Sequence, residues 1–302
     1  MQRGHLIKSG KFLAGPALAA TLLLTSGCLV RRETRVQPSQ LPPPAREASL
    51  ADLIAKLDAR SRDVRTLNAT VDLQPTAGSI YSGVIKEYQD VRGFILAERP
   101  AMIRVLGQAP VVRTDIFDMV SNGEEFRLNI PPLQKFIVGK TNFCRPAKNS
   151  LENLRPQHIL EALLVPPLDA SHEKWFLEEA EEGGHRFYAV TVVEPADEEL
   201  RPKRKAWFDR TNLELVRMQF YESDGFYVED VQYSGYQDFQ GTSYPSHIEV
   251  TRPIEDYRLA ITILKATFNQ PIELEKFILN KPEGVQLVDL AAKAEQEKPR
   301  GQ

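Results

Sequence analysis

Residues 114–131 read TDIFDMVSNGEEFRLNIP. The pair at 122–123 is Asn-Gly, the strongest short-range signal for a two-residue hairpin turn, and it lies between two runs rich in β-branched and aromatic residues. After the turn, Phe126, Leu128 and Ile130 alternate with polar residues, so one face of this strand is apolar. The stretch therefore predicts an antiparallel hairpin with one face turned towards a core.

Similar strand-like runs lie on both sides of this hairpin, separated by short turn signals. They are NATVDL (68–73), GVIKEYQ (83–89), GFILAE (93–98), MIRVLG (102–107), KFIVG (135–139), HRFYAVTVV (185–193), KRKAWFD (203–209), LELVRMQFY (213–221), GFYVEDVQY (225–233), HIEV (247–250) and RLAITILKATF (258–268). Consecutive strands with short turns favour an antiparallel sheet, so we expect one open, curved sheet of about 11–12 strands.

Two segments have helical spacing instead. SLADLIAKLDARSRDVRTL (49–67) begins with Ser49 and carries Asp52 three residues later, the pattern of an N-terminal cap. RPQHILEALLVPP (155–167) has prolines at both ends, where prolines suit a helix boundary. The predicted fold is therefore α+β: an antiparallel half-barrel covered by an N-terminal helix and one or two further helices.

The first 27 residues are typical of a secretory signal peptide. They contain three basic residues, no acidic residue and a 14-residue apolar run over 12–25, which is shorter than the about 20 residues that span a bilayer. The following LTSGC (24–28) resembles the lipobox of bacterial lipoproteins, although Thr25 stands where that motif usually has leucine. The resemblance implies lipidation at Cys28. The alternative is an ordinary signal peptide followed by an unmodified cysteine.

A bacterial lipoprotein cysteine carries several acyl chains, palmitate among them, and more than one chain is needed for stable anchoring. Leu29, rather than aspartate, follows Cys28, which favours the outer membrane. Removal of the signal peptide leaves 35 basic and 41 acidic residues, a net charge of −6. We expect a signal peptide over 1–27, the lipidated cysteine and a Pro/Arg-rich tether over 28–48, a folded domain over 49–290 and a charged flexible tail over 291–302.

The sequence contains no motif for catalysis, a metal or a cofactor. The four histidines after the signal peptide have no metal-ligand spacing, and CxxC, GxSxG, GxxxxGK[ST] and GxGxxG are all absent. The glutamates of 178–182 are interpreted as a solvated turn rather than an ion site. No basic excess points to a nucleic acid. We therefore expect a protein that is not an enzyme and that binds no metal, cofactor or nucleic acid.

If the curved sheet leaves a cavity, its apolar strand residues would line it and favour apolar ligands, at about 25 cal/mol per Å² of buried surface. The alternative is that these residues are ordinary core. The candidate lining residues are Phe94, Leu96, Ile103, Val105, Phe117, Met119, Phe126 and Leu128.

Over about residues 49–280 the chain resembles the LolA/LolB-like superfamily of periplasmic lipoprotein carriers and receptors. The resemblance rests on 49–73, 93–100 with 101–107, 114–131, WFDRTNLELVRMQFY (207–221) and YSGYQDFQGTSYPSHIEV (233–250). It implies an unclosed antiparallel barrel with helices as a lid over an apolar cavity that takes up acyl chains. It also implies an exposed apolar loop that touches the membrane, for which Leu133 is the candidate.

These observations lead to a first functional hypothesis. The chain would be an outer-membrane lipoprotein, anchored to the membrane and facing the periplasm, that binds acyl chains of lipids or lipoproteins during envelope trafficking. The alternative is an envelope sensor or scaffold that uses the same fold to bind another envelope protein without transporting lipid. A large apolar pocket favours the first hypothesis, and a filled interior favours the second.

Overall fold

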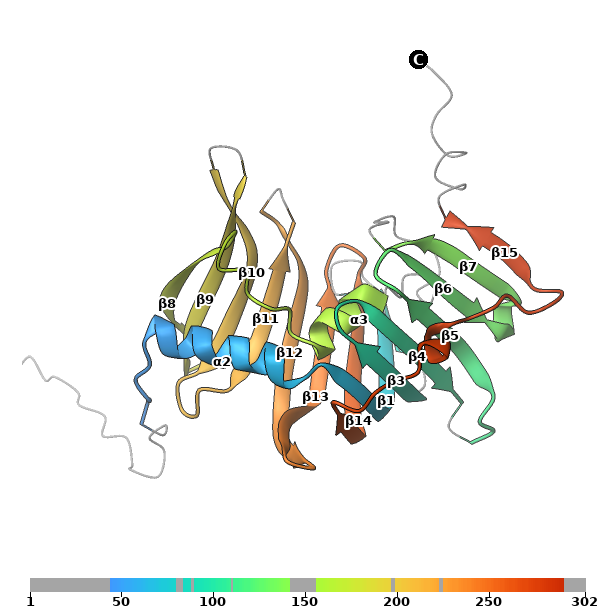
Figure 1. Ribbon diagram of the computed structural model, residues 1–302, viewed down its shortest axis with the longest axis horizontal. Helices are drawn as coiled ribbons and strands as arrows, with labels where there is room; N and C mark the ends of the chain where they lie inside the picture. Colours follow the sequence, from blue (N-terminus) through green and yellow to red (C-terminus); the bar gives the residue numbers. More distant parts are fainter. Residues whose placement is uncertain are drawn as a thin grey trace, which may run out of the picture. The chain divides into compact units, whose positions relative to one another are not determined.

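The computed structural model describes residues 44–79, 84–87, 90–109, 111–141, 156–196, 199–222 and 225–290. Within these ranges the chain forms a single 15-stranded sheet and two α-helices (Figure 1). Most strands follow the order β15-β7-β6-β5-β4-β3-β1-β14-β13-β12-β11-β10-β9-β8, and β2 pairs with β1 beside this path.

The helices are α2 (Leu50–Asp63) and α3 (Pro156–Leu163), with short 3-10 turns at η2 (Pro131–Leu133) and η4 (Leu274–Phe277). The strands are β1 (Thr66–Ser79), β2 (Val84–Glu87), β3 (Val91–Glu98), β4 (Met102–Gln108), β5 (Asp115–Ser121), β6 (Glu125–Ile130), β7 (Lys135–Lys140), β8 (Lys174–Glu182), β9 (His185–Ala196), β10 (Glu199–Asp209), β11 (Leu215–Tyr221), β12 (Tyr227–Phe239), β13 (Thr242–Arg252), β14 (Tyr257–Phe268) and β15 (Gln286–Asp289).

Neighbouring strands pair in antiparallel fashion, except that β15 runs parallel to β7. The two outermost strands, β8 and β15, do not pair with each other in the described part of the chain, so the sheet is open. The prediction of an open antiparallel sheet with an N-terminal helix and a second helix is confirmed. The sheet has more strands than the predicted number of about 11–12.

Two strands, β8 and β15, were not predicted. The segment 178–182 was expected to be a solvated turn, and this expectation is wrong because it forms the second half of β8. Its carboxylates pair with cations beyond the adjacent strand β9: Glu178 with Lys205 of β10 at 2.6 Å, and Glu179 with Arg210, just after β10, at 2.7 Å. Opposite charges supplied from β10 and the turn after it thus allow a glutamate-rich segment to remain in the sheet.

Helix α2 begins with the predicted cap. The backbone amide of Asp52 donates to Ser49 Oγ at 3.2 Å, and the amide of Ser49 donates back to the Asp52 carboxylate at 2.9 Å. Leu53 and Leu57, one turn apart, are fully buried, and each such side chain contributes about 1.5–3 kcal/mol to stability. Figure 1 shows α2 running across the strands β9–β12.

Helix α3 packs on the middle of the same face, against β4, β5 and β13. Ile159, Leu160 and Leu163 are buried there. Both helices share one continuous hydrophobic core with the inner face of the sheet. The described residues from Pro44 to Leu290 form one compact unit, and no helix among them is long and apolar enough to cross a bilayer.

Candidate functional site

A cleft of about 690 Å³ lies between the C-terminal half of α2 and the turns that join β10 to β11 and β12 to β13. Its volume is within the range of ligand-binding pockets. The apolar and aromatic residues that line it are Leu57, Ala59, Val64, Phe208, Leu213, Leu215, Tyr236 and Tyr244. The charged residues that line it are Lys56, Arg60, Arg62, Asp63 and Glu214. Of the apolar set, Ala59, Leu213 and Tyr236 are partly exposed and the others are buried, so these three supply the accessible apolar side chains of the cleft.

Arg60 is held in this cleft by three tyrosine rings. Its guanidinium carbon lies 5.3 Å from the ring centroids of Tyr233 and Tyr236 and 5.4 Å from that of Tyr244. A cation at this distance from a ring face is attracted by the ring quadrupole. The three aromatic contacts fix the position of a long, otherwise flexible side chain.

The tyrosine hydroxyls point away from Arg60 and hold backbone carbonyls. Tyr233 donates to the carbonyl of Ala162 at 3.0 Å, and Tyr244 donates to that of Leu163 at 2.6 Å. These carbonyls belong to the last turn of α3, where a helix has no internal donors left to satisfy them. The cage around Arg60 and the end of α3 are thus built from the same side chains.

Burial raises the pKa of all three tyrosines, that of Tyr236 to about 12. Arg60 acts in the opposite direction, because a nearby positive charge favours the phenolate, but its effect is the smaller one. The tyrosines therefore stay neutral at physiological pH, and the charge of Arg60 is not cancelled by its cage.

Arg60 has no hydrogen-bond acceptor among the described residues. Its Nε and Nη2 atoms are buried without a partner. Arg62, two residues later on the same cleft, differs because its Nη2 lies 3.2 Å from the Asp58 carboxylate and its side chain is 69% exposed. Arg60 is thus a fixed, unpaired cation in the wall of a cleft.

Two side chains fix the end of α2 beside this cleft. Asn269 donates to the carbonyl of Asp63 at 2.7 Å and accepts from the amide of Arg65 at 2.9 Å. Arg99 donates from Nε to the carbonyl of Val64 at 3.1 Å. The helix, which was predicted to reach residue 67, ends at Asp63 because the chain turns into extended geometry at Val64.

The eight predicted lining residues do not share one surface. Ile103 and Val105 of β4 pair with Ala97 and Ile95 of β3, whose side chains face the helices. Since side chains alternate along a strand, Phe94 and Leu96 point to the opposite face of the sheet. Phe94 is accordingly 41% exposed on the outer face, with Leu96 beside it in the alternation. The remaining members of the set are at most 3% exposed within the core: Ile103, Val105, Phe117, Met119, Phe126 and Leu128.

The space around these core residues is filled. A Cβ added to Gly107 would meet the ring of Phe117 at 2.4 Å, and one added to Gly139 would meet the ring of Phe126 at 2.9 Å. Each ring thus packs directly on the backbone of a neighbouring strand. This part of the sheet is a packed core, as the alternative interpretation of these residues anticipated, and the cleft lies in the other half.

Leu133 lies where it can meet another surface. It ends the 3-10 turn η2 between β6 and β7 and is 39% exposed. Cys28, the predicted lipidation site, lies outside the described residues, as does the tether up to residue 43.

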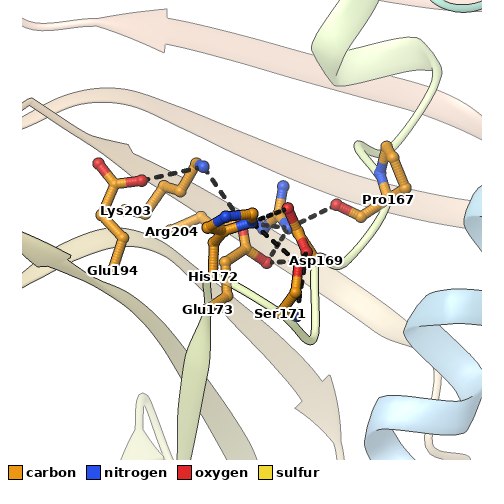
Figure 2. Close-up of polar contacts among 8 residues, drawn as sticks. All are labelled: Pro167, Asp169, Ser171, His172, Glu173, Glu194, Lys203 and Arg204. Carbon is orange, nitrogen blue, oxygen red and sulfur yellow. Dashed lines mark hydrogen bonds and ion pairs between the residues drawn. The ribbon is translucent and has the colours of Figure 1, made fainter.

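A second group of charged residues joins the segment after α3 to strand β10 (Figure 2). Arg204 and Glu173 are almost fully buried and pair at 2.9 Å, and Arg204 also donates to the carbonyl of Pro167 at 2.7 Å. Lys203 lies 3.2 Å from Glu173 and 3.1 Å from Glu194. Burial lowers the pKa of Arg204, and Glu173 opposes that effect. The group is a clamp that fixes the path of the chain into β8.

Ser171, His172 and Asp169 lie beside this clamp in Figure 2, but they do not form a catalytic triad. Ser171 Oγ and Asp169 Oδ2 both approach Nδ1 of His172, at 2.9 Å and 2.8 Å, whereas a triad uses opposite ring nitrogens. His172 is also 81% exposed. These contacts lower the pKa of Asp169, first through Ser171, and stabilise a turn.

A third polar group lies under α3. His158 Nδ1 is 3.1 Å from the buried carboxylate of Glu229, which also pairs with Arg252 at 3.0 Å. Glu161, one turn further along α3, has a raised pKa because it is buried. No cluster of three or more potential metal ligands occurs in the part of the chain that the structure describes.

The sequence interpretation missed the residues that define the cleft. Arg60 lies on the predicted first helix, but its spacing does not distinguish it from the other basic residues there. The tyrosines come from YSGYQDFQGTSY (233–244), a hairpin rich in aromatic residues and glycine. The three tyrosines around one turn were a signal that the sequence analysis could have used. Their position next to α2, however, follows only from the fold.

No family model matches the sequence, and no curated protein matches it. Among solved structures, a LolA superfamily protein from Nitrosomonas europaea is similar at a TM-score of 0.48 and 10% identity, over 77% of this chain and 99% of that one. A DUF1329 family protein from Desulfovibrio piger is similar at 0.49 and 13% identity, over 75% and 95%. A domain described as an outer membrane lipoprotein-sorting protein, from Vibrio parahaemolyticus, is similar at 0.48 and 11% identity, over 74% and 94%. The structural similarity to LolA superfamily proteins that the sequence predicted is therefore found, at low identity.

Proposed function

We propose that this chain is a lipoprotein of the bacterial envelope that binds acyl chains of lipids or lipoproteins in the cleft beneath α2. The supporting observation is the cleft itself, about 690 Å³, whose lining combines the partly exposed Ala59, Leu213 and Tyr236 with charged residues. An amphiphile would place its chain against Leu213 and Tyr236, where about 25 cal/mol is gained for each Å² removed from water. Binding and release need no covalent chemistry.

The proposed anchor is Cys28, cleaved from the signal peptide 1–27 and lipidated, with the protein held at the outer membrane and facing the periplasm. Its tether would span roughly 50 Å between Cys28 and Pro44 if fully extended at about 3.1 Å per residue. Arg46, in the described last part of the predicted tether 28–48, donates its amide to the carbonyl of Arg210 at 2.6 Å, in the turn that leads to the cleft residue Leu213. The domain thus receives its tether next to the proposed binding site, and Leu133 is proposed to touch the membrane.

The test is photo-crosslinking of the full chain in living cells. A photoreactive amino acid at Ser243, which lines the cleft, should give crosslinked species that contain an acyl chain. The matched control is Ser234, which follows Tyr233 on β12 and therefore points to the opposite face. Equal lipid crosslinking from both positions, or none from Ser243, contradicts the proposal.

A second function is favoured by the packed β3–β6 half, where the predicted lining residues are core. An interior filled in this way suits an envelope sensor or scaffold that binds a protein. The same crosslinking experiment separates the two functions, because a single protein partner at Ser243 without lipid would favour the scaffold.

A further inference from the structure

Among the arginines of the cleft, Arg62 pairs with Asp58, whereas Arg60 forms no ion pair among the described residues and is held by three tyrosine rings. Asp63 and Glu214 line the same cleft, yet neither forms an ion pair with Arg60 within the described ranges. Glu214 instead accepts a hydrogen bond from the side chain of Asn212 at 2.7 Å. Nε and Nη2 of Arg60 are buried, so Nη1 is the guanidinium nitrogen that can donate to an acceptor from outside the chain.

We propose that Arg60 recognises the headgroup of the ligand, so that the cleft selects amphiphiles with an acidic headgroup, a phosphate or a carboxylate, over zwitterionic or neutral ones. This inference rests on the proposed function and names the class of ligand for the same cleft.

The chemistry of the guanidinium supports this choice. A hydrogen bond from Nη1 to a carboxylate or phosphate oxygen is charge-assisted, and such bonds are about twice as strong as neutral ones. The rings of Tyr233, Tyr236 and Tyr244 hold the group in place before the ligand arrives, so little side-chain entropy is lost on binding. The partly exposed apolar residues of the same cleft, Leu213 and Tyr236, would receive the chain that follows the headgroup.

The experiment measures binding of two lysophospholipids with identical acyl chains to the exported chain without its anchor, residues 29–302, below the micelle concentration. Lysophosphatidylglycerol carries a net negative charge, and lysophosphatidylcholine is zwitterionic. The wild type should prefer the anionic lipid by about tenfold, since a hydrogen bond to a charged group is the stronger kind. Arg60→Gln should remove this preference, because it weakens the binding of lysophosphatidylglycerol more than that of lysophosphatidylcholine, whose phosphate is balanced by its own choline cation.

Two variants provide the controls. Arg92→Gln removes an arginine of β3 that lies outside the cleft and pairs with Asp72 at 3.0 Å, so it should keep the preference. Arg60→Lys keeps the positive charge and should retain part of the preference for the anionic lipid. A melting temperature for each variant shows that the fold is intact.

The outcomes separate this inference from the proposed function. If both lipids bind the wild type equally, or if Arg60→Gln keeps the preference, the inference is overturned and the lipid-binding function stands. If neither lipid binds, both fail. If inorganic phosphate alone binds in an Arg60-dependent manner and displaces the lipid at equal concentration, the site recognises free anions and the lipid assignment is overturned.

Discussion

The hydroxyl of Tyr244 donates to the carbonyl oxygen of Leu163 at 2.6 Å, while the ring of the same tyrosine lies 5.4 Å from the guanidinium of Arg60. One buried side chain therefore serves both the last turn of α3 and the wall of the cleft. Removing the hydroxyl oxygen of Tyr244 should therefore affect the stability of the fold but not the binding of a ligand.

The variant Tyr244→Phe should lower the free energy of unfolding by about 1–3 kcal/mol, because the buried carbonyl of Leu163 loses its donor. Ligand binding should be nearly unchanged, since the ring that faces Arg60 remains. Urea denaturation and lysophosphatidylglycerol titration measure the two effects. A loss of binding with unchanged stability would reverse the assigned roles of ring and hydroxyl.

The buried pair of Glu173 and Arg204 should be more sensitive than the exposed pair of Asp58 and Arg62. Glu173→Ala leaves the guanidinium of Arg204 buried with one fewer partner, which costs about 3–5 kcal/mol. Asp58→Ala should cost less than about 1 kcal/mol, because surface ion pairs contribute little. Thermal and urea unfolding of the two variants decide this. Equal losses would contradict the clamp that joins the α3–β8 segment to β10.

Glu161 gives a pH-dependent prediction. Burial raises its pKa above the ordinary value of 4.5, so the folded chain binds more protons than the unfolded chain between the two pKa values. Stability attributable to Glu161 is therefore lost as the pH rises through that window. Glu161→Gln should be more stable than the wild type at pH 8, and the difference should vanish below about pH 4, where both states are protonated.

Urea unfolding at a series of pH values measures this effect, with Glu181→Gln on the exposed part of β8 as the control. The control should show no comparable gain at pH 8. A Glu161→Gln variant that is less stable than the wild type at pH 8 would mean that the charged carboxylate is favoured under α3.

The packed half of the sheet can be tested at Gly107. An added Cβ would lie 2.4 Å from the ring of Phe117, which is only 3% exposed and has little room to move. Gly107→Ala should therefore cost about 1–3 kcal/mol, the usual penalty of overpacking. Urea unfolding measures this effect. A variant as stable as the wild type would indicate empty space beside Phe117, and this half of the sheet would then contain a cavity.

The sequence predicted the elements whose patterns are local. The Asn122-Gly123 turn joins β5 to β6, and the Ser49–Asp52 cap opens α2, because these signals depend only on neighbouring residues. It did not identify which face of GFILAE (93–98) is buried, since apolar residues occupy both faces of that strand. In the structure Ile95 is buried and Phe94 is exposed. Pairing with the neighbouring strands β1 and β4 determines which face of β3 is turned towards the core.

The cleft could not be predicted for a related reason. Arg60 stands on the first helix and Tyr244 on β13, and no local pattern relates two residues so far apart in sequence. β8 was not predicted because its glutamates resemble a solvated turn in the sequence. Their partners, such as Lys205 on β10, come from distant parts of the chain. Sites built from long-range contacts become visible only when the order of strands in the sheet is known.

The most direct test of the lipid-binding cleft is a crystal structure of residues 29–302 with lysophosphatidylglycerol. We expect the phosphate within hydrogen-bonding distance of the Arg60 guanidinium and the acyl chain along Leu213 and Tyr236, beneath α2. A lipid bound among the β3–β6 residues, or a cleft that stays empty at saturating lipid, would contradict it.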